Sequence, residues 1–599
     1  MRKSTLFDFL NGYEEAAYST GSSKSEKSFF VRKYSGSLSH HAKKFSSNPI
    51  YKFFLALSRR VTFTSSRTFG AAALTFGILT LVFHFTTELF EMYETNTVTS
   101  LIIGILSSVL SVPFLITDRP LSVLAGENAL TSYVFFDFLC MRKVYYTGTE
   151  KGIPIYVGAI LGIIPVAIAF FIPTWAVLLG ITALVVVYIA FLSPEFGFFV
   201  SLILLPYMSY IPYSTEFLLV IIAVAMLSFL RKTVFGKRIL NLEQYDLLVI
   251  LFMLAILLSG LYNGTVASFG ATLEFVVFAL GYMIVSNVVT NRRLCDRTIS
   301  AVALSSVPVA LVSFVTVFSA LADGTVRDRL SEGVKSTFES TDTLAAFLIV
   351  AIIFAVILIK QSHGGLRALY TAVMVLDVFA LAISGELFAL FALLLSIGAY
   401  FALRVKRFSG VLLLVLAAVP YTIFLLPDVA RDKIFELLPT NLTASETLAL
   451  WRECLASLRE HVFLGVGVGS SSFADEISGF LDAENLFLGL ALEAGCIAFA
   501  IFVLMLAVRL RHRAHYMGYI KGTEIGTAEP LIETAMFALL AYGATDFLWS
   551  DGTMFYLFIV VFGLGSATLR IAKKENDDRT LYYRDIKQHD FSVLDIHIR

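Results

Sequence analysis

The sequence contains little charge and few cysteines. Asp, Glu, Lys and Arg make up 15% of the 599 residues, whereas 57% are apolar, and the mean hydropathy is +0.78. A soluble domain of this composition would expose large apolar patches. The four cysteines show no paired spacing, so we expect no disulfide framework. The low charge excludes an ordinary soluble enzyme, and the few cysteines exclude a disulfide-stabilised secreted domain.

Other features are also missing. Residues 1–65 are polar, rich in Ser and Lys and without an apolar core, so we expect a cytoplasmic, partly disordered tail rather than a cleavable signal sequence. No metal-spaced cluster of His and Asp stands out in the segments expected outside the membrane. We therefore expect no metal, no cofactor and no nucleic-acid partner.

Apolar runs of membrane-spanning length recur along the chain instead. A helix needs about 20 apolar residues to cross a bilayer core. We predict an all-α, polytopic membrane protein with about 14–16 transmembrane helices and one large extracytoplasmic loop. The expected spans are 69–89, 98–116, 154–172, 174–192, 196–212, 216–230, 246–262, 272–290, 298–320, 343–360, 367–384, 386–404, 409–426, 485–508, 530–548 and 553–571.

The positions of Lys and Arg predict the orientation. With these spans, six basic segments fall on one side, which the positive-inside rule makes cytoplasmic together with both termini. They are Arg142-Lys143, Arg231 to Arg238, Arg292-Arg293, Arg404 to Arg407, Arg509 to Arg513 and Arg570 to Lys574. Residues 321–342 and 427–484 then lie outside, and 119–141 is expected as an interfacial helix. The expected regions are a tail at 1–65, N-terminal spans at 66–300, a central membrane region at 301–510 with the loop 427–484, C-terminal spans at 511–572 and a cytoplasmic tail at 573–599.

Cations on the outer face run against the positive-inside trend. The loop 321–342 carries Arg327, Arg329 and Lys335, and the large loop carries Arg452. Such side chains suit phosphate or another anion. Local pairing of these cations with neighbouring carboxylates is the alternative.

The large loop contains a helical segment and a glycine-rich turn. Residues 446–460 have helical spacing, with Leu448, Trp451, Leu455 and Leu458 on one face. The turn Gly465-Val-Gly-Val-Gly469 lacks the Lys-Ser/Thr that follows a phosphate-binding loop, so we interpret it as a close approach of two backbones. The next span begins at Glu484-Asn485 and carries Glu493, an intramembrane carboxylate that is either functional or part of a buried hydrogen-bond network.

These motifs, in this order, resemble the O-antigen ligase and O-antigen polymerase superfamily. The family shows a Gly-x-Gly-x-Gly…Phe turn, then His-Asn-x-x-Leu and Glu-x-Gly at the start of a span. The resemblance covers roughly residues 300–510 and departs from the family at several positions. The family's His is Glu484, the Arg of its Ser-Arg-Gly turn is Gly385, the Arg before Trp451 is Thr447, and its Asn-Pro-Asn corner reads Ser340-Thr341-Asp342.

The resemblance implies a metal-independent, inverting glycan ligase or polymerase. Its donor would be a glycan on polyprenyl diphosphate, and its acceptor a hydroxyl at the outer face of the bacterial cytoplasmic membrane, in surface polysaccharide biosynthesis. Glu484, Asn485 and Glu493 are then the candidate catalytic residues, and Arg327, Arg329, Lys335 and Arg452 the candidate diphosphate site. Membrane lipid and other polysaccharide-assembly proteins are the further expected partners. A non-catalytic scaffold, or a polysaccharide exporter or flippase component, is the alternative.

Overall fold

Helices dominate the part of the chain that the computed structural model describes. That part comprises residues 48–90, 98–139, 141, 152–234, 238, 240, 244–263, 266–326, 333–404, 444–469, 485–520, 523–546 and 548–596. Within it, 11 helices are long and apolar enough to cross a membrane, and Ile155–Ala169 and Asp246–Tyr262 are shorter apolar helices. The prediction of an all-α, multi-pass membrane protein is confirmed to this extent. The expected span 409–426 and residues 427–443 and 470–484 of the expected loop lie outside the described residues.

The chain divides into two compact units. The first comprises Met1–Gly197 and Leu227–Leu240, and the second comprises Phe198–Met226 and Asn241–Arg599. Two of the three boundaries therefore fall inside helices, one in α11 (Pro194–Leu204) and one in α12 (Ser214–Val234).

The first unit is organised around α5 (Ser66–Phe90), which packs against α6 (Val98–Ile116) and α9 (Ile155–Ala169). Small residues allow these helices to approach closely. Any Cβ at Gly158 or Gly162 would collide with the backbone of α5, as expected for small residues at helix interfaces in membranes. The unit's other helices are α4 (Pro49–Thr62), α7 (Leu121–Glu127), α8 (Ala129–Ser132), η1 (Tyr133–Phe138) and α10 (Thr174–Leu192). The segment expected as one interfacial helix at 119–141 is thus three short ones.

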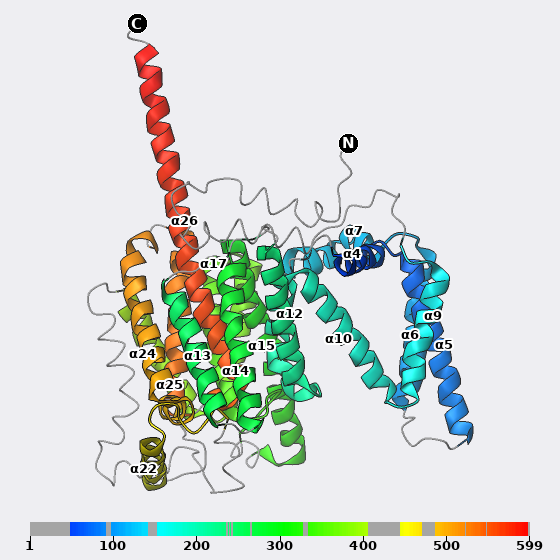
Figure 1. The fold of residues 1–599 in the computed structure, drawn as a ribbon, viewed down its shortest axis with the longest axis horizontal. Coiled ribbons are helices and arrows are strands. Elements are labelled where there is room, and N and C mark those ends of the chain that lie inside the picture. Colours follow the sequence, from blue (N-terminus) through cyan, green and yellow to red (C-terminus); the bar gives the residue numbers. More distant parts are fainter. Residues whose placement is uncertain are drawn as a thin grey trace. The chain divides into compact units, whose positions relative to one another are not determined.

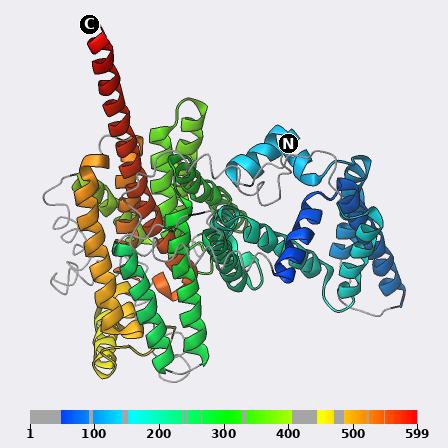
Figure 2. The same cartoon turned by 45° about the horizontal axis from the view of Figure 1, so that its top comes forward.

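The second unit is a helical bundle, shown in Figures 1 and 2. Its remaining helices are η2 (Leu205–Tyr210), α13 (Gln244–Asn263), α14 (Val266–Val288), α15 (Arg292–Asp323), α17 (Thr341–Gln361), α18 (Gly365–Ile383), α19 (Leu387–Arg404), α22 (Ala444–Glu460), α24 (Leu486–Ile520), η4 (Glu524–Thr527), α25 (Glu529–Gly543), η5 (Leu548–Ser550) and α26 (Gly552–Ile596).

Three helices form the core of this bundle. The most apolar window of α17 is 83% buried and that of α26 is 94% buried, and nearly every residue of α25 is buried. Protein therefore surrounds these helices on nearly every side, which suits apolar residues on all their faces apart from the paired carboxylates of α25. In Figure 1, α22 lies at one end of this unit, and the C-terminal part of α26 leaves the opposite end. We refer to the end with α22 as the α22 end.

Several helix boundaries differ from those expected. Helix α24 continues past residue 508 to Ile520, and α26 continues to Ile596, through the segment expected as a tail. The expected span 196–212 is α11 followed by the 3-10 helix η2, which contains Pro206. Proline has no backbone N–H and cannot continue the α-helical ladder.

Candidate functional site

The glycine-rich turn packs against a break in α24. Gly495 has φ +82° and ψ 166°, which divides α24 into a short N-terminal arm and a long span. The turn fills the break with backbone hydrogen bonds. The N–H groups of Val466 and Gly467 donate to the carbonyls of Leu492 and Glu493, each at 2.9 Å, and the N–H of Cys496 donates to Val462 O at 2.9 Å. The interpretation of this turn as a close backbone approach is confirmed.

Glu493 connects the glycine-rich turn to α24. It is 5% exposed, and its Oε2 accepts a hydrogen bond from the N–H of Gly469 at 3.2 Å. Its backbone carbonyl also accepts from Ser259 Oγ at 3.0 Å. Because Glu493 binds the turn through its side chain and its backbone, its position supports a structural role in this junction.

Asn485 caps the N-terminus of α24. Its Oδ1 accepts from the N–H groups of Phe487 and Leu488 at 2.9 and 3.1 Å, which satisfies donors that the helix leaves unpaired. Its Nδ2 donates to Ala544 O at 3.0 Å, just past the end of α25. The adjacent candidate base, Glu484, lies outside the described residues.

The candidate diphosphate site is described only in part. Lys335 and Arg452 are both exposed, whereas Arg327 and Arg329 lie outside the described ranges. Lys335 precedes α17, and Arg452 lies on α22. The structure therefore shows two of the four cations, each at an exposed position.

The packed face of helix α22 includes Leu458 of the expected face but differs from it elsewhere. Leu450 and Cys454 are buried against Leu492, and Leu458 packs beside them, whereas Leu455 is 49% exposed. The expected face, which included Trp451 and Leu455, is therefore wrong at Leu455. The i, i+4, i+8 spacing of 450, 454 and 458 fits a helix equally well, and Cys454 is small enough to pack closely on α24.

A cluster of polar side chains that the sequence interpretation missed lies where α17, α19 and α25 meet, with Tyr542 buried and Thr341, Asp342 and Glu386 half-buried. Thr341 Oγ1 donates to Glu386 Oε1 at 2.7 Å. The Tyr542 hydroxyl lies 3.4 Å from Asp342 Oδ1 and 3.4 Å from Glu386 Oε2. Asp342 is near enough to Glu386 for its negative charge to act on the Glu386 carboxyl. We refer to Asp342, Glu386 and Tyr542 as the carboxyl cluster.

The surroundings of Glu386 favour its protonated form. The pKa of Glu386 is raised to about 7, first by burial and then by the negative charge of Asp342. More acidic groups lie at the same end of the unit. Burial raises the pKa of Asp551, whose Oδ1 accepts from Thr553 N and Oγ1 at 2.8 and 2.7 Å at the start of α26. Glu386 is thus the group at this end whose pKa lies near neutral pH, and the pKa of Asp551 is raised in the same direction.

Glu386 should make the stability of the protein depend on pH. Its pKa is about 7 in the folded protein and near 4.5 in the unfolded chain, so the folded state binds more protons between these values. The free energy of unfolding should therefore fall as pH rises from about 4.5 to about 7. Thermal unfolding in detergent at several pH values should show a smaller decline for Glu386→Gln than for wild type. Glu453→Gln, an exposed change on α22, should keep the wild-type decline, and an unchanged profile for Glu386→Gln would contradict this assignment.

The opposite end of α25 carries buried ion pairs. Arg509 Nη2 lies 2.6 Å from Glu533 Oε1, and Arg513 Nε lies 2.7 Å from Glu529 Oε1. These four side chains are at most 3% exposed. The segment Arg509 to Arg513 is therefore helical and partly buried rather than a basic loop.

A third buried pair extends this polar layer. Arg570 Nη2 lies 3.1 Å from Asp246 Oδ2, and the Tyr282 hydroxyl bonds Asp246 Oδ1. Tyr282 also reaches Ser566 Oγ at 3.3 Å, which accepts from Arg509 Nη1 at 3.0 Å. Buried pairs of this kind fix helix register rather than bind ligand, since each charge already has its partner.

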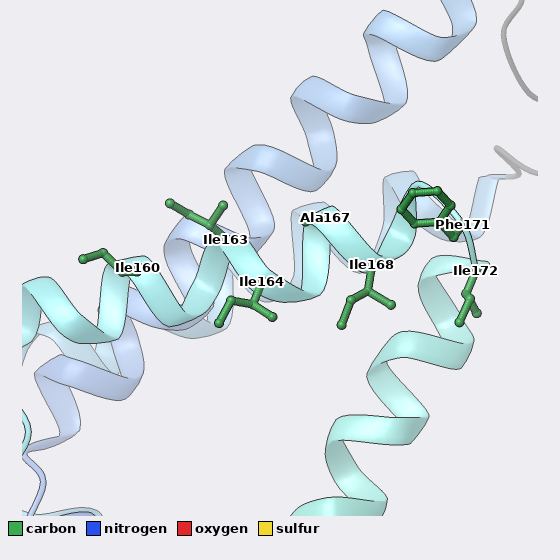
Figure 3. A pocket seen from close by; sticks show the side chains of 7 residues that line it. All are labelled: Ile160, Ile163, Ile164, Ala167, Ile168, Phe171 and Ile172. Atoms are coloured by element: carbon green, nitrogen blue, oxygen red, sulfur yellow. The ribbon is translucent and has the colours of Figure 1, made fainter.

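The groove in Figure 3 has no polar lining. It follows one side of α9 and the turn after it, from Ile160 to Ile172, and every side chain that lines it is apolar. A surface of this kind on a membrane-length helix suits lipid chains and offers no group for chemistry. It is therefore not a candidate active site.

The described residues contain no group of three or more His, Cys, Asp or Glu side chains that could hold a metal ion. No family model matches the chain, and no curated protein matches it.

Proposed function

We propose that this protein is a membrane glycosyltransferase of the O-antigen ligase and polymerase type. It would move a glycan from polyprenyl diphosphate to a hydroxyl acceptor at the outer face of a bacterial cytoplasmic membrane. One observation carries the proposal: the separate segments that resemble the family meet around the C-terminal end of α25. Asn485 bonds Ala544 O there, and Tyr542 lies beside both Asp342 and Glu386.

The proposed chemistry needs a proton acceptor and a stabilised leaving group. The acceptor oxygen attacks the anomeric carbon, the bond from that carbon to the diphosphate oxygen breaks, and the acceptor proton passes to a carboxylate. Glu484 is the proposed base because it occupies the position of the family's His, directly before Asn485. Arg327, Arg329, Lys335 and Arg452 are the proposed counter-charges for the departing diphosphate.

Substitution of Glu484 tests this proposal directly. Purified protein in proteoliposomes would be given a polyprenyl-diphosphate oligosaccharide, and transferred or lengthened glycan would be measured. Glu484→Gln should lose transfer by about 100-fold or more, because a general base typically contributes a factor of that size. Glu484→His should retain transfer. If Gln is as active as wild type, Glu484 only caps a helix, and if wild type and Glu484→His are both inert with every donor, the scaffold alternative is favoured.

The proposed site requires the α22 end to lie outside the membrane and the far end of α26 to lie in the cytoplasm. The basic segments at the helix ends motivate this orientation. We expect a cysteine at Ala456, an exposed position on α22, to react with an impermeant thiol reagent on intact cells. A cysteine at Lys574, an exposed position on α26, should react only after lysis. The reverse pattern would place the carboxyl cluster in the cytoplasm.

A further inference from the structure

Asp377 is a carboxyl group buried inside the second unit. It lies in α18, is 0% exposed, and its Oδ2 is 2.8 Å from Ser306 Oγ on α15. Its Oδ1 is buried and has no hydrogen-bond partner among the described residues. No arginine or lysine of the described residues forms an ion pair with it. An ionised carboxylate in these surroundings would cost far more free energy than a neutral acid.

The two contacts of Ser306 fit a protonated Asp377. Ser306 Oγ lies 2.8 Å from Ala303 O and 2.8 Å from Asp377 Oδ2, but a hydroxyl group has one proton. Ala303 O can only accept. If Ser306 donates to Ala303, the contact with Asp377 is a hydrogen bond only when Asp377 carries the proton and donates it. A protonated Asp377 therefore satisfies both contacts at once.

The neighbouring stretch of α15 contains a proline and accepts hydrogen bonds from two other segments. Pro308 lies inside this helix, where it cannot donate to the preceding turn. The Tyr207 hydroxyl donates to Ser305 O at 2.8 Å, and Ser336 Oγ donates to Val309 O at 2.6 Å. Ser336 adopts φ +54°, a strained conformation for a serine. The next side chain, Thr337, has a buried Oγ1 without a partner among the described residues.

We propose that Asp377 and Ser306 form a proton-binding site between α15 and α18, in which Asp377 is an uncharged carboxylic acid when the two helices are packed together. Loss of the proton would leave a buried carboxylate whose one hydrogen bond among the described residues comes from Ser306 and whose Oδ1 is uncompensated. Ionisation therefore requires α15 and α18 to separate or water to reach Oδ1. The site couples the packing of this helix pair to proton uptake, and it does not depend on the proposed glycan transfer.

The charged groups of the surrounding helices lie toward helix ends. Helices α15, α17 and α19 pack against α18. Their described ionisable residues are Arg292, Arg293, Cys295, Asp296, Arg297 and Asp323 on α15, Asp342 and Lys360 on α17, and Tyr400 and Arg404 on α19, with Glu386 just before α19. Tyr207 of η2 and, on α18 itself, Arg367 and Tyr370 complete the set. Ser306 is the group that directly contacts the Asp377 carboxyl.

Reaction with an apolar carbodiimide tests the protonation state. Dicyclohexylcarbodiimide adds to a carboxylic acid: the acid proton moves to a carbodiimide nitrogen, the carboxyl oxygen bonds the central carbon, and rearrangement leaves a stable N-acylurea without a leaving group. Full-length protein in membranes would be labelled from pH 5 to pH 9 and the adduct located by peptide mass spectrometry. We expect an adduct at Asp377 up to neutral pH or above, and none at Glu533, which is equally buried but paired with Arg509.

Two outcomes would overturn the proposal. One is equal labelling of Asp377 and Glu533. The other is no adduct at Asp377 at any pH in the folded protein although the denatured protein is labelled. Sodium or potassium ions should not suppress the adduct, since suppression by either ion would instead make Asp377 a cation ligand.

A stability measurement provides an independent readout. Asn resembles a protonated Asp, because its amide can donate to Ser306 and its oxygen replaces Oδ1. Asp377→Asn should therefore unfold within a few degrees of wild type, and its melting temperature should not depend on sodium or potassium. Asp377→Leu removes both polar atoms but keeps a side chain of similar size. It therefore separates the effect of losing the proton site from the effect of losing packing. A large loss for Asp377→Asn would show that the native group is ionised.

Discussion

Replacing Arg509 with methionine is expected to destabilise the protein more than any other single change considered above. Arg509 is 1% exposed, bonds Glu533 through Nε and Nη2, and donates to Phe562 O at 2.7 Å. Its removal leaves the Glu533 carboxylate buried without its counter-charge. Breaking a buried ion pair in this way costs about 3–5 kcal/mol. Thermal or denaturant unfolding in detergent would measure the loss.

Two further variants separate the effect of breaking the ion pair on stability from the effect of removing one positive charge. Arg511→Met removes an exposed arginine two residues away and should leave stability unchanged. Adding Glu533→Gln to Arg509→Met should recover much of the lost stability, because no uncompensated charge then remains. If the double variant is less stable than Arg509→Met alone, the pair is not the source of the effect.

Replacing Gly495 with alanine is expected to detach the glycine-rich turn from α24. The backbone of Gly495 adopts a region that is almost restricted to glycine, and a Cβ there would collide with Phe463 O. Strain alone costs about 1–3 kcal/mol. The loss of the adjoining backbone hydrogen bonds adds to it. Hydrogen exchange should show the Gly467 and Cys496 amides losing protection.

A second glycine of the same helix is the matched control. Gly518 is exposed, and a Cβ there meets nothing within 4 Å. Gly518→Ala should be neutral or stabilising by up to about 1 kcal/mol, since alanine is the better helix former. If Gly495→Ala behaves like Gly518→Ala, the break in α24 does not need a glycine.

The sequence predicts single helices better than it predicts how they meet. Apolar runs are sufficient to identify α17 and α26, because helix length and hydropathy are local properties. The break at Gly495 is not visible in the pattern, since one glycine in an apolar run is compatible with a continuous helix. The backbone of residues 462–467, which precede α24 in the sequence, specifies the break because it forms hydrogen bonds with α24 there.

Charges are harder still to interpret from sequence alone. Arg509 counts as a cytoplasmic cation in a topology prediction, yet its partner Glu533 lies 24 residues away in a different helix. The carboxyl cluster likewise joins Thr341 to a side chain 45 residues later and Asp342 to one 200 residues later. The family resemblance identified residues 340–342 and 384–386 as two separate segments. The packing of α17, α19 and α25 against one another brings their side chains into one cluster.

The length of α25 has a consequence for how the bilayer meets this protein. Its 15 residues span about 22 Å, whereas a bilayer core is about 30 Å thick. The N-terminal turns carry Glu529 and Glu533, which no lipid could solvate, and guanidinium groups of α24 neutralise them. One of these, on Arg513, also donates to Leu403 O at 2.8 Å and so reaches a third helix. The neighbouring helices thus accommodate the short length of α25, and the membrane need not become thinner. Helix α25 is stable because protein, not lipid, surrounds it.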